Sequence, residues 1–221
     1  MTSRPLRILL TGFEPFGGEP VNPSQRLAED LACDRLEGIA LDIAVLPVDI
    51  RVVTDVLEAA ISRTQPDAIV LVGQAANRDA VCLETTAFNQ VAYGDVVDNG
   101  GARIQDAPVE ENGPHQLHST LPLEEVERTL VAAGHPVRRS DDAGRYLCNH
   151  VLYTTLRRHP DTPSAFVHVP LLPDQAERRA LAEPSLSHDT LRACLRELLT
   201  RLPHHLAASR SSSDGRPADA P

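Results

Sequence analysis

Residues 143–153 read Ala143-Gly144-Arg145-Tyr146-Leu147-Cys148-Asn149-His150-Val151-Leu152-Tyr153, and they place one cysteine where a loop turns into a helix. From Cys148 onward, apolar residues recur at the spacing of one buried helical face, at Val151, Leu152 and Leu156. Gly144 does not readily continue a strand or a helix, so a helix is predicted to begin near Cys148. A thiol at a helix N-terminus meets unpaired N–H groups and the positive end of the dipole, which both favour the thiolate.

A histidine follows twenty residues later. Residues 165–169 form a short apolar run around His168, which predicts a buried strand. A cysteine at a helix start and a histidine on the next strand form the arrangement that a Cys–His nucleophile needs. The residues alone leave a second interpretation open, because a lone cysteine is more often a small core residue.

The rest of the chain alternates between buried strands and amphipathic helices. Strands are predicted at residues 6–11, 42–48, 68–73 and 136–139, and helices from Asn22 and at residues 50–63, 123–133 and 187–202. Asn22 suits an N-cap and Pro23 the first helical position. This alternation predicts an α/β fold, a single-domain three-layer α/β/α sandwich with a mostly parallel twisted sheet.

The predicted domain covers residues 1–208. Residues 209–221 contain almost no apolar side chain, so we expect a disordered C-terminal tail. Residues 81–93 alternate with period two and enclose Glu84, which is either on a solvated face or buried with a partner. Residues 94–116 form a long loop rich in Gly, Asp, Asn and Pro, and such loops are often functional.

Composition narrows the class of function. The formal charge of −10 without a basic run argues against nucleic acid and anionic membranes as partners. No apolar run reaches the length of about 18 residues that spans a membrane, and no signal peptide precedes the first strand. The cysteines form no CxxC pair, which favours reduced thiols in the cytoplasm over a disulfide scaffold or a zinc site. The histidines form no ligand motif and the glycine loop at residues 12–18 lacks nucleotide-binding spacing, so neither a metal nor a cofactor is expected.

Four motifs in one order resemble the pyroglutamyl peptidase (pyrrolidone-carboxylate peptidase) family of cysteine peptidases. They are residues 11–18 with 21–24, residues 72–75, residues 143–150 and residues 166–175. Each motif is short, but their shared order and spacing make the set specific. The resemblance runs from about Leu6 to the last predicted helix.

The resemblance implies a role for each matching residue. Cys148 becomes the nucleophile, His168 the base, and Glu84 the acid that orients the histidine. The substrate-binding residues that it implies are Phe13, Phe16, Asn22, Gln74 and Leu147. Such proteins are single-domain α/β enzymes that need no metal and are often tetrameric, so a homotetramer is the assembly that the resemblance suggests.

The implied reaction is removal of an N-terminal pyroglutamyl residue from a peptide. A pyroglutamyl terminus carries a lactam instead of an ammonium group, so its pocket needs flat apolar walls and a few hydrogen bonds. Phe13 and Phe16 suit the walls, as exposed aromatic residues of a loop or, alternatively, as residues packed beneath it. Gln74 would pair with the lactam through one donor and one acceptor. Cys33, Cys82 and Cys194 are expected to be structural.

Two departures from the family pattern keep an alternative open. Thr85 stands where the family has an arginine, and a second family arginine falls at about Tyr93 or Gly94. Arg103 either reaches back to replace the lost charge or is solvated. The alternative function is that of a divergent, low-activity member that binds a pyroglutamyl-like or other small amide ligand.

Overall fold

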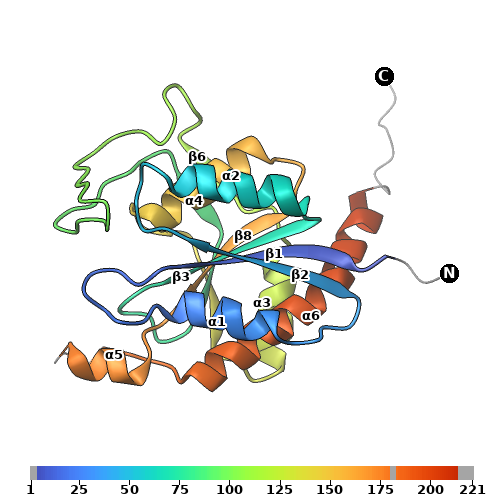
Figure 1. Ribbon diagram of the computed structural model, residues 1–221. Coiled ribbons are helices and arrows are strands. Elements are labelled where there is room, and N and C mark those ends of the chain that lie inside the picture. The colour runs from blue at the N-terminus through green and yellow to red at the C-terminus, as the bar shows by residue number, and fades with distance from the viewer. Residues whose placement is uncertain (1–3, 180–182, 214–221) are drawn as a thin grey trace.

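A six-stranded twisted sheet forms the middle layer of the protein (Figure 1). The computed structural model describes residues 4–179 and 183–213. The strand order is β2-β1-β3-β8-β4-β7, with β1 at Leu6–Phe13, β2 at Ile39–Leu46, β3 at Ala68–Gln74, β4 at Val81–Glu84, β7 at Val137–Ser140 and β8 at Ser164–Val169. Strands β2, β1, β3 and β8 are parallel, whereas β4 pairs antiparallel with β8 and parallel with β7. The predicted mostly parallel sheet is therefore confirmed.

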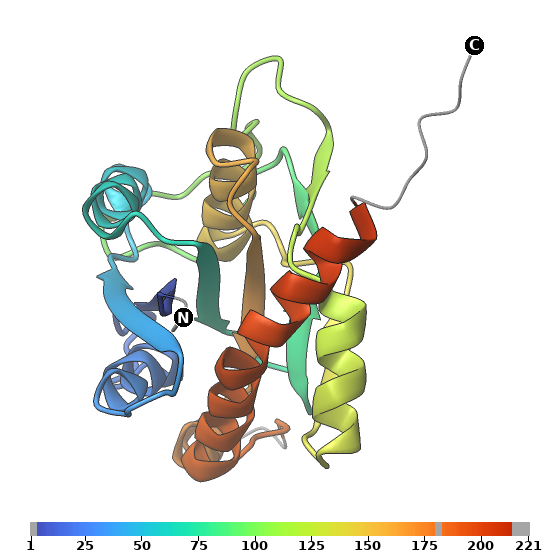
Figure 2. The same ribbon diagram turned by 90° about the vertical axis from the view of Figure 1, so that its right-hand side faces the viewer.

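Helices cover both faces of this sheet (Figures 1 and 2). On one face lie α2 (Val53–Thr64) and α4 (Leu147–Arg158), which share a buried apolar cluster with β1, β3 and β8. A second cluster on the other face contains residues of α1 (Pro23–Ala32), α3 (Leu123–Ala132) and α6 (His188–Ser213). The three-layer α/β/α prediction is confirmed. In the described part of the chain, no helix is long and apolar enough to cross a membrane.

The first helix begins where the sequence predicts. Asn22 is its N-cap, and the Asn22 Oδ1 atom accepts a hydrogen bond from the Ser24 N–H at 3.0 Å. Pro23 occupies the first turn, where its missing N–H costs nothing. The Ser24 hydroxyl oxygen in turn accepts a hydrogen bond from the Phe13 N–H at 3.0 Å. The end of β1 and the start of α1 are thereby joined.

A short hairpin lies beside α4. Strands β5 (Thr86–Phe88) and β6 (Gln116–His118) pair antiparallel, and the long predicted loop lies between them. The buried Asn149 side chain of α4 accepts a hydrogen bond from the Phe88 N–H at 2.8 Å and donates to the Phe88 and Gln90 carbonyl groups. One turn further along α4, the Tyr153 hydroxyl donates to the Pro114 carbonyl oxygen at 2.8 Å. Both ends of this loop are therefore tied to α4.

The last helix differs from its prediction. It was expected to end at residue 202, but α6 continues to Ser213 although Pro203 lies inside it. The apolar face extends past the proline, since Leu206 is buried like Leu202. Residues 209–213, which the sequence assigned to a disordered tail, continue this helix, and the rest of that predicted tail, residues 214–221, lies outside the described residues.

Gly12 provides the first testable consequence of the fold. A Cβ atom at Gly12 would lie 2.4 Å from the Ser24 carbonyl oxygen, so β1 and α1 would have to separate. We expect Gly12→Ala to lower the free energy of unfolding by about 1–3 kcal/mol, the usual cost of overpacking. Urea unfolding measures this change. Gly38→Ala is the control. A Cβ atom there would meet open space, so the substitution costs only the strain of placing alanine at a positive φ of 73°. Equal or smaller destabilisation by Gly12→Ala would contradict the steric argument.

Candidate active site

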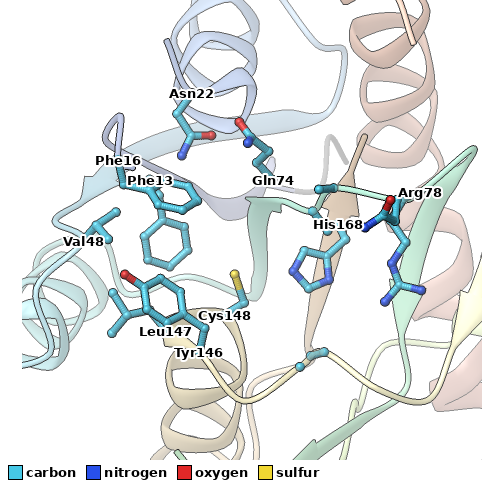
Figure 3. A pocket seen from close by; sticks show the side chains of 15 residues that line it. Phe13, Phe16, Asn22, Val48, Gln74, Arg78, Tyr146, Leu147, Cys148 and His168 are labelled. Carbon is cyan, nitrogen blue, oxygen red and sulfur yellow. The ribbon is translucent and has the colours of Figure 1, made fainter. Parts of the chain in front are cut away.

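A pocket of about 360 Å³ opens at the carboxyl ends of the parallel strands (Figure 3). The C-terminal ends of strands β1, β3 and β8 lie at this edge, and α4 begins at the same edge. Ligands in open α/β sheets bind at this edge. The predicted site residues that line the pocket are Phe13, Phe16, Asn22, Gln74, Leu147, Cys148 and His168. The remaining predicted residue, Glu84, lies behind His168.

Cys148 is the second residue of α4, one position later than the helix start at Leu147. The N-cap residue Tyr146 makes no side-chain capping bond, so no side chain of the cap occupies the N–H groups of the first turn. The Cys148 Sγ atom packs closely against the backbone of β3. A Cβ atom at Gly73 would lie 3.0 Å from Sγ and 2.6 Å from the Phe166 ring, so only glycine fits there.

His168 and Glu84 form a buried pair next to the thiol. The His168 Nδ1 atom lies 2.8 Å from the Glu84 Oε1 atom, and Glu84 is completely buried. Strand β4 brings them together because its antiparallel register sets Cys82 opposite His168 and Glu84 diagonally across from it. Figure 3 shows the His168 ring beside the Cys148 sulfur. Of the two interpretations of Glu84, burial with a partner is therefore confirmed.

The environment of His168 favours its protonated form. Burial alone would lower the pKa of His168, but the negative charge of Cys148 and the hydrogen bonds to Cys148 and Glu84 outweigh burial. The pKa of His168 is raised from 6.5 to about 9. An imidazolium beside Cys148 is what stabilises a thiolate nucleophile at neutral pH.

The two phenylalanines line the pocket, but they are not both exposed. Phe13 is only 3% exposed and belongs to the apolar cluster under α2 and α4. Phe16 is half-buried, and its ring centroid lies 6.1 Å from that of Tyr146. Of the two interpretations left open, packing beneath the loop therefore holds for Phe13, which is the last residue of β1.

The polar end of the pocket consists of Asn22 and Gln74, which come from different layers. Both side chains already have partners. The Asn22 Nδ2 atom donates to the Glu14 carbonyl oxygen at 3.0 Å, and the Gln74 Oε1 atom accepts from Gln175 at 3.0 Å. One N–H of Asn22 and both N–H groups of Gln74 have no partner among these contacts.

Sequence reasoning missed Arg78, which lines the pocket. Its Nη2 atom lies 3.6 Å from the Glu84 Oε1 atom and donates to the Asp142 carbonyl oxygen at 3.2 Å. Arg78 is the first basic residue after β3 and lies three residues beyond the motif at residues 72–75. This position was the only feature of the sequence that could have indicated a role in the site. Arg78 joins the buried carboxylate to the loop that leads to Cys148.

The expected substitute for the lost arginine, Arg103, does not reach the pocket. Its guanidinium contacts Asp95, its Nε atom donates to the Gly94 carbonyl oxygen at 3.0 Å, and the side chain is exposed. Tyr93, at one of the two positions expected for the family's second arginine, is buried with its ring centroid 4.4 Å from that of Tyr146. At that position the chain therefore has an aromatic side chain packed against Tyr146 instead of a positive charge.

The other cysteines differ among themselves. Cys82 and Cys194 are buried, and burial raises the pKa of both thiols, that of Cys194 to about 12. Cys33, which was expected to be structural like the other two, is instead exposed at the C-cap of α1 and is not among the pocket residues. In the residues that the structure describes, no three His, Cys, Asp or Glu side chains gather to hold a metal ion.

Comparison with known proteins places the chain in a family. The family model described as pyroglutamyl peptidase matches residues 6–200. A pyrrolidone-carboxylate peptidase from Vibrio vulnificus (strain CMCP6) is 38% identical over 188 residues, 84% of this chain and 87% of that protein. One from Chromobacterium violaceum is 40% identical over 190 residues, 86% of this chain and 89% of that protein.

A solved structure leads to the same conclusion. A mutant pyrrolidone carboxyl peptidase from the hyperthermophile Pyrococcus furiosus matches this fold with a TM-score of 0.86 and 32% identity, covering 91% of this chain and 100% of that chain. The match extends over nearly the whole chain, including the sheet and the helices that surround the pocket. The chain belongs to the pyroglutamyl peptidase family.

Proposed function

We propose that this protein is a cysteine peptidase that removes the pyroglutamyl residue from the N-terminus of peptides. The observation that carries the proposal is the Glu84–His168 pair buried beside Cys148 at a helix start, on the edge of an aromatic pocket. The fold and the family support the same reaction. The substrate is a peptide whose N-terminal residue is pyroglutamate.

The reaction follows from the roles of these three side chains. His168 already holds the proton of the thiol as an imidazolium, and the Cys148 sulfur attacks the carbonyl carbon that links the ring to the next residue. Backbone N–H groups of the first turn of α4 receive the oxyanion, since no side-chain cap occupies them. Protonated His168 gives its proton to the leaving amine. Water then attacks the thioester, and free pyroglutamate is released.

The pocket suits a neutral ring. Phe13, Phe16 and Leu147 provide apolar walls, and Tyr146 extends the wall from Phe16. Asn22 and Gln74 provide amide groups at the other end of the pocket (Figure 3). None of these side chains is a carboxylate, so an ammonium group at an ordinary peptide N-terminus would enter without a partner.

Arg78 supports the pair from behind. A carboxylate without solvent exposure pays a large desolvation cost, and a cation close by favours its ionised form. At 3.6 Å from Glu84, Arg78 supplies that cation. We assign Arg78 as a positioning residue that holds the Glu84 side chain in place and thereby keeps His168 oriented.

The assembly and location remain proposals from the family resemblance. We propose a homotetramer, which light scattering coupled to size-exclusion chromatography tests directly. We also propose a cytoplasmic location, which is supported by four cysteines that form no disulfide. The competing function, a divergent binder with little turnover, is favoured by the absence of arginine at Thr85 and Tyr93.

Hydrolysis of pyroglutamyl-aminomethylcoumarin by the purified protein distinguishes the two functions. We expect turnover by the parent protein and none by Cys148→Ala, whose melting temperature should stay within a few degrees because only a small cavity forms. Cys33→Ala is the matched control, since this exposed thiol lies far from the pocket residues in the fold and should keep full activity. Binding of the substrate by the parent protein without hydrolysis would favour the binder.

The pH profile tests the Glu84–His168 pair. Because the pKa of His168 is about 9, we expect kcat/KM to fall as the pH rises through that region and the imidazolium loses its proton. Glu84→Gln removes the neighbouring negative charge, so the pKa of His168 falls and this alkaline limb moves to lower pH. A charge-assisted hydrogen bond of about 1.5–3 kcal/mol corresponds to about one to two pH units. An alkaline limb that does not move would show that Glu84 is not coupled to His168.

A comparison of two arginines tests which one serves the site. We expect Arg78→Ala to lower kcat/KM by about tenfold, the loss of one charge-assisted contact of about 1.5 kcal/mol, and Arg78→Lys to restore part of it. Arg103→Ala is the control and should stay within about twofold of the parent, because Arg103 contacts only its own loop in the contacts above. A larger loss from Arg103→Ala than from Arg78→Ala would reverse the assignment.

A further inference from the structure

Two buried glutamines form a pair at the polar end of the pocket. Gln74, at the end of β3, lines the pocket and is 9% exposed. Gln175 lies behind it in α5 (Pro173–Arg178), is 1% exposed, and is not among the residues that line the pocket. Gln175 therefore does not touch a ligand in this pocket, and its side-chain contact with a pocket-lining side chain is the one with Gln74.

Backbone groups fix the orientation of the Gln175 amide. Its Oε1 atom accepts a hydrogen bond from the Leu172 N–H at 3.0 Å, and its Nε2 atom donates to the Val21 carbonyl oxygen at 3.1 Å. A backbone N–H can only donate and a backbone carbonyl can only accept. Turning the Gln175 amide over would break both hydrogen bonds and set like groups against each other.

A charged group on the same side favours this orientation. Glu19 approaches Gln175 and pairs with Arg178 and Arg179. Burial raises the pKa of Glu19, but the hydrogen bonds from Arg178 and Arg179 outweigh burial, and the net shift is downward. An ionised carboxylate accepts hydrogen bonds only, so it also attracts the amide nitrogen of Gln175.

The fixed orientation of the Gln175 amide in turn determines the orientation of the Gln74 amide. With its oxygen bonded to Leu172, Gln175 offers only its nitrogen, which donates to the Gln74 Oε1 atom at 3.0 Å. If the Gln74 amide were turned over, two NH₂ groups would face each other inside a buried contact, which is costly. The Gln74 oxygen is therefore held toward α5, and its NH₂ group is the end left for the pocket, above Cys148 and beside Asn22 (Figure 3).

We propose that Gln175 is a positioning residue that holds Gln74 with its NH₂ group toward the ligand, so that Gln74 donates to the ring carbonyl of the pyroglutamyl lactam. This inference rests on the proposed function, because it concerns the ring of that substrate. It also refines the expectation that Gln74 would pair with the lactam through both a donor and an acceptor. The Gln74 oxygen accepts from Gln175 and is held toward α5, so the NH₂ group is the part of the amide that meets the ring.

Specificity for the carbonyl follows from this arrangement. A donor that is held in place and buried loses its water when a ring enters, so a ring without an acceptor leaves the donor unpaired. Sites that are built to bond a polar group discriminate strongly against analogues that lack it. A prolyl substrate, whose ring has no carbonyl, is rejected at this point even before its positive charge is considered.

Two substitutions separate positioning from simple structural support. Gln175→Glu keeps an oxygen for the Leu172 N–H but removes both donors, so Gln74 turns its NH₂ toward the new carboxylate and its oxygen toward the pocket. Gln175→Met removes every hydrogen bond and releases Gln74 without choosing an orientation. Gln116→Glu on the exposed strand β6 is the control for an added negative charge.

The measurements are KM and kcat for pyroglutamyl-aminomethylcoumarin, Ki for 2-pyrrolidone as the isolated lactam, and the rate of Cys148 alkylation by iodoacetamide. We expect Gln175→Glu to raise KM and Ki by about tenfold or more, with kcat within about threefold and alkylation unchanged. Gln175→Met should raise KM and Ki less than Gln175→Glu, although it loses more hydrogen bonds. Gln116→Glu should match the parent.

The reverse order overturns the inference. If Gln175 only supports α5, then Gln175→Met is the more damaging change, in KM as in melting temperature. Parent-like KM and Ki in both variants also overturn it. Should Gln175→Glu fail to fold, an unchanged KM in Gln175→Met alone is sufficient to reject the role, and a rise in KM with unchanged melting temperature and unchanged alkylation supports it.

Failure of the proposed function would look different. In that case the parent protein hydrolyses no pyroglutamyl-aminomethylcoumarin, and the kinetic constants do not exist. The increase in melting temperature that 2-pyrrolidone produces then replaces KM as the measurement. A smaller increase in Gln175→Glu than in the parent supports the positioning role, and equal increases reject it.

Discussion

The hydrogen bond between His168 and Glu84 is the constraint on which the site depends. A carboxylate without solvent contact is stable only with partners, and Glu84 finds them in the His168 ring and the Arg78 guanidinium. The bond exists because β4 runs antiparallel to β8, which places Glu84 diagonally across from the histidine. The antiparallel pairing of β4 with β8 therefore positions the Glu84–His168 pair beside Cys148.

Close backbone approach is the second requirement. Gly73 leaves space for the Cys148 sulfur and the Phe166 ring, so the nucleophile rests directly on the sheet. Gly12 does the same for β1 and α1, which brings Phe13 and Asn22 to one pocket from two elements. These contacts lie within the rigid layers of the fold. The loops that follow β1 and β3 then complete the lining of the pocket.

The sequence predicted the features that depend on local patterns. The layers, the start of the helix near Cys148 and the cap at Asn22 all follow from periodicity and capping within a few residues. It did not predict the features that depend on distant pairing: the antiparallel register of β4, the contact between Arg78 and Glu84, and the pair of Gln74 and Gln175, whose partners lie 101 residues apart. The burial of Phe13 was left open and the extension of α6 past Pro203 was missed, because apolar contacts from other elements decide both.

The two attachments of the long loop to α4 have an evolutionary consequence. Asn149 holds the beginning of the connection between β5 and β6, and Tyr153 holds its end, one helical turn apart. Exposed residues between these two anchors, such as Val96 and Val97, are the ones free to change in composition. The buried Tyr93 is not among them, because it packs against Tyr146 at the N-cap of the helix that carries Cys148. A lineage with such anchors can explore new surfaces around the pocket while its nucleophile stays in place.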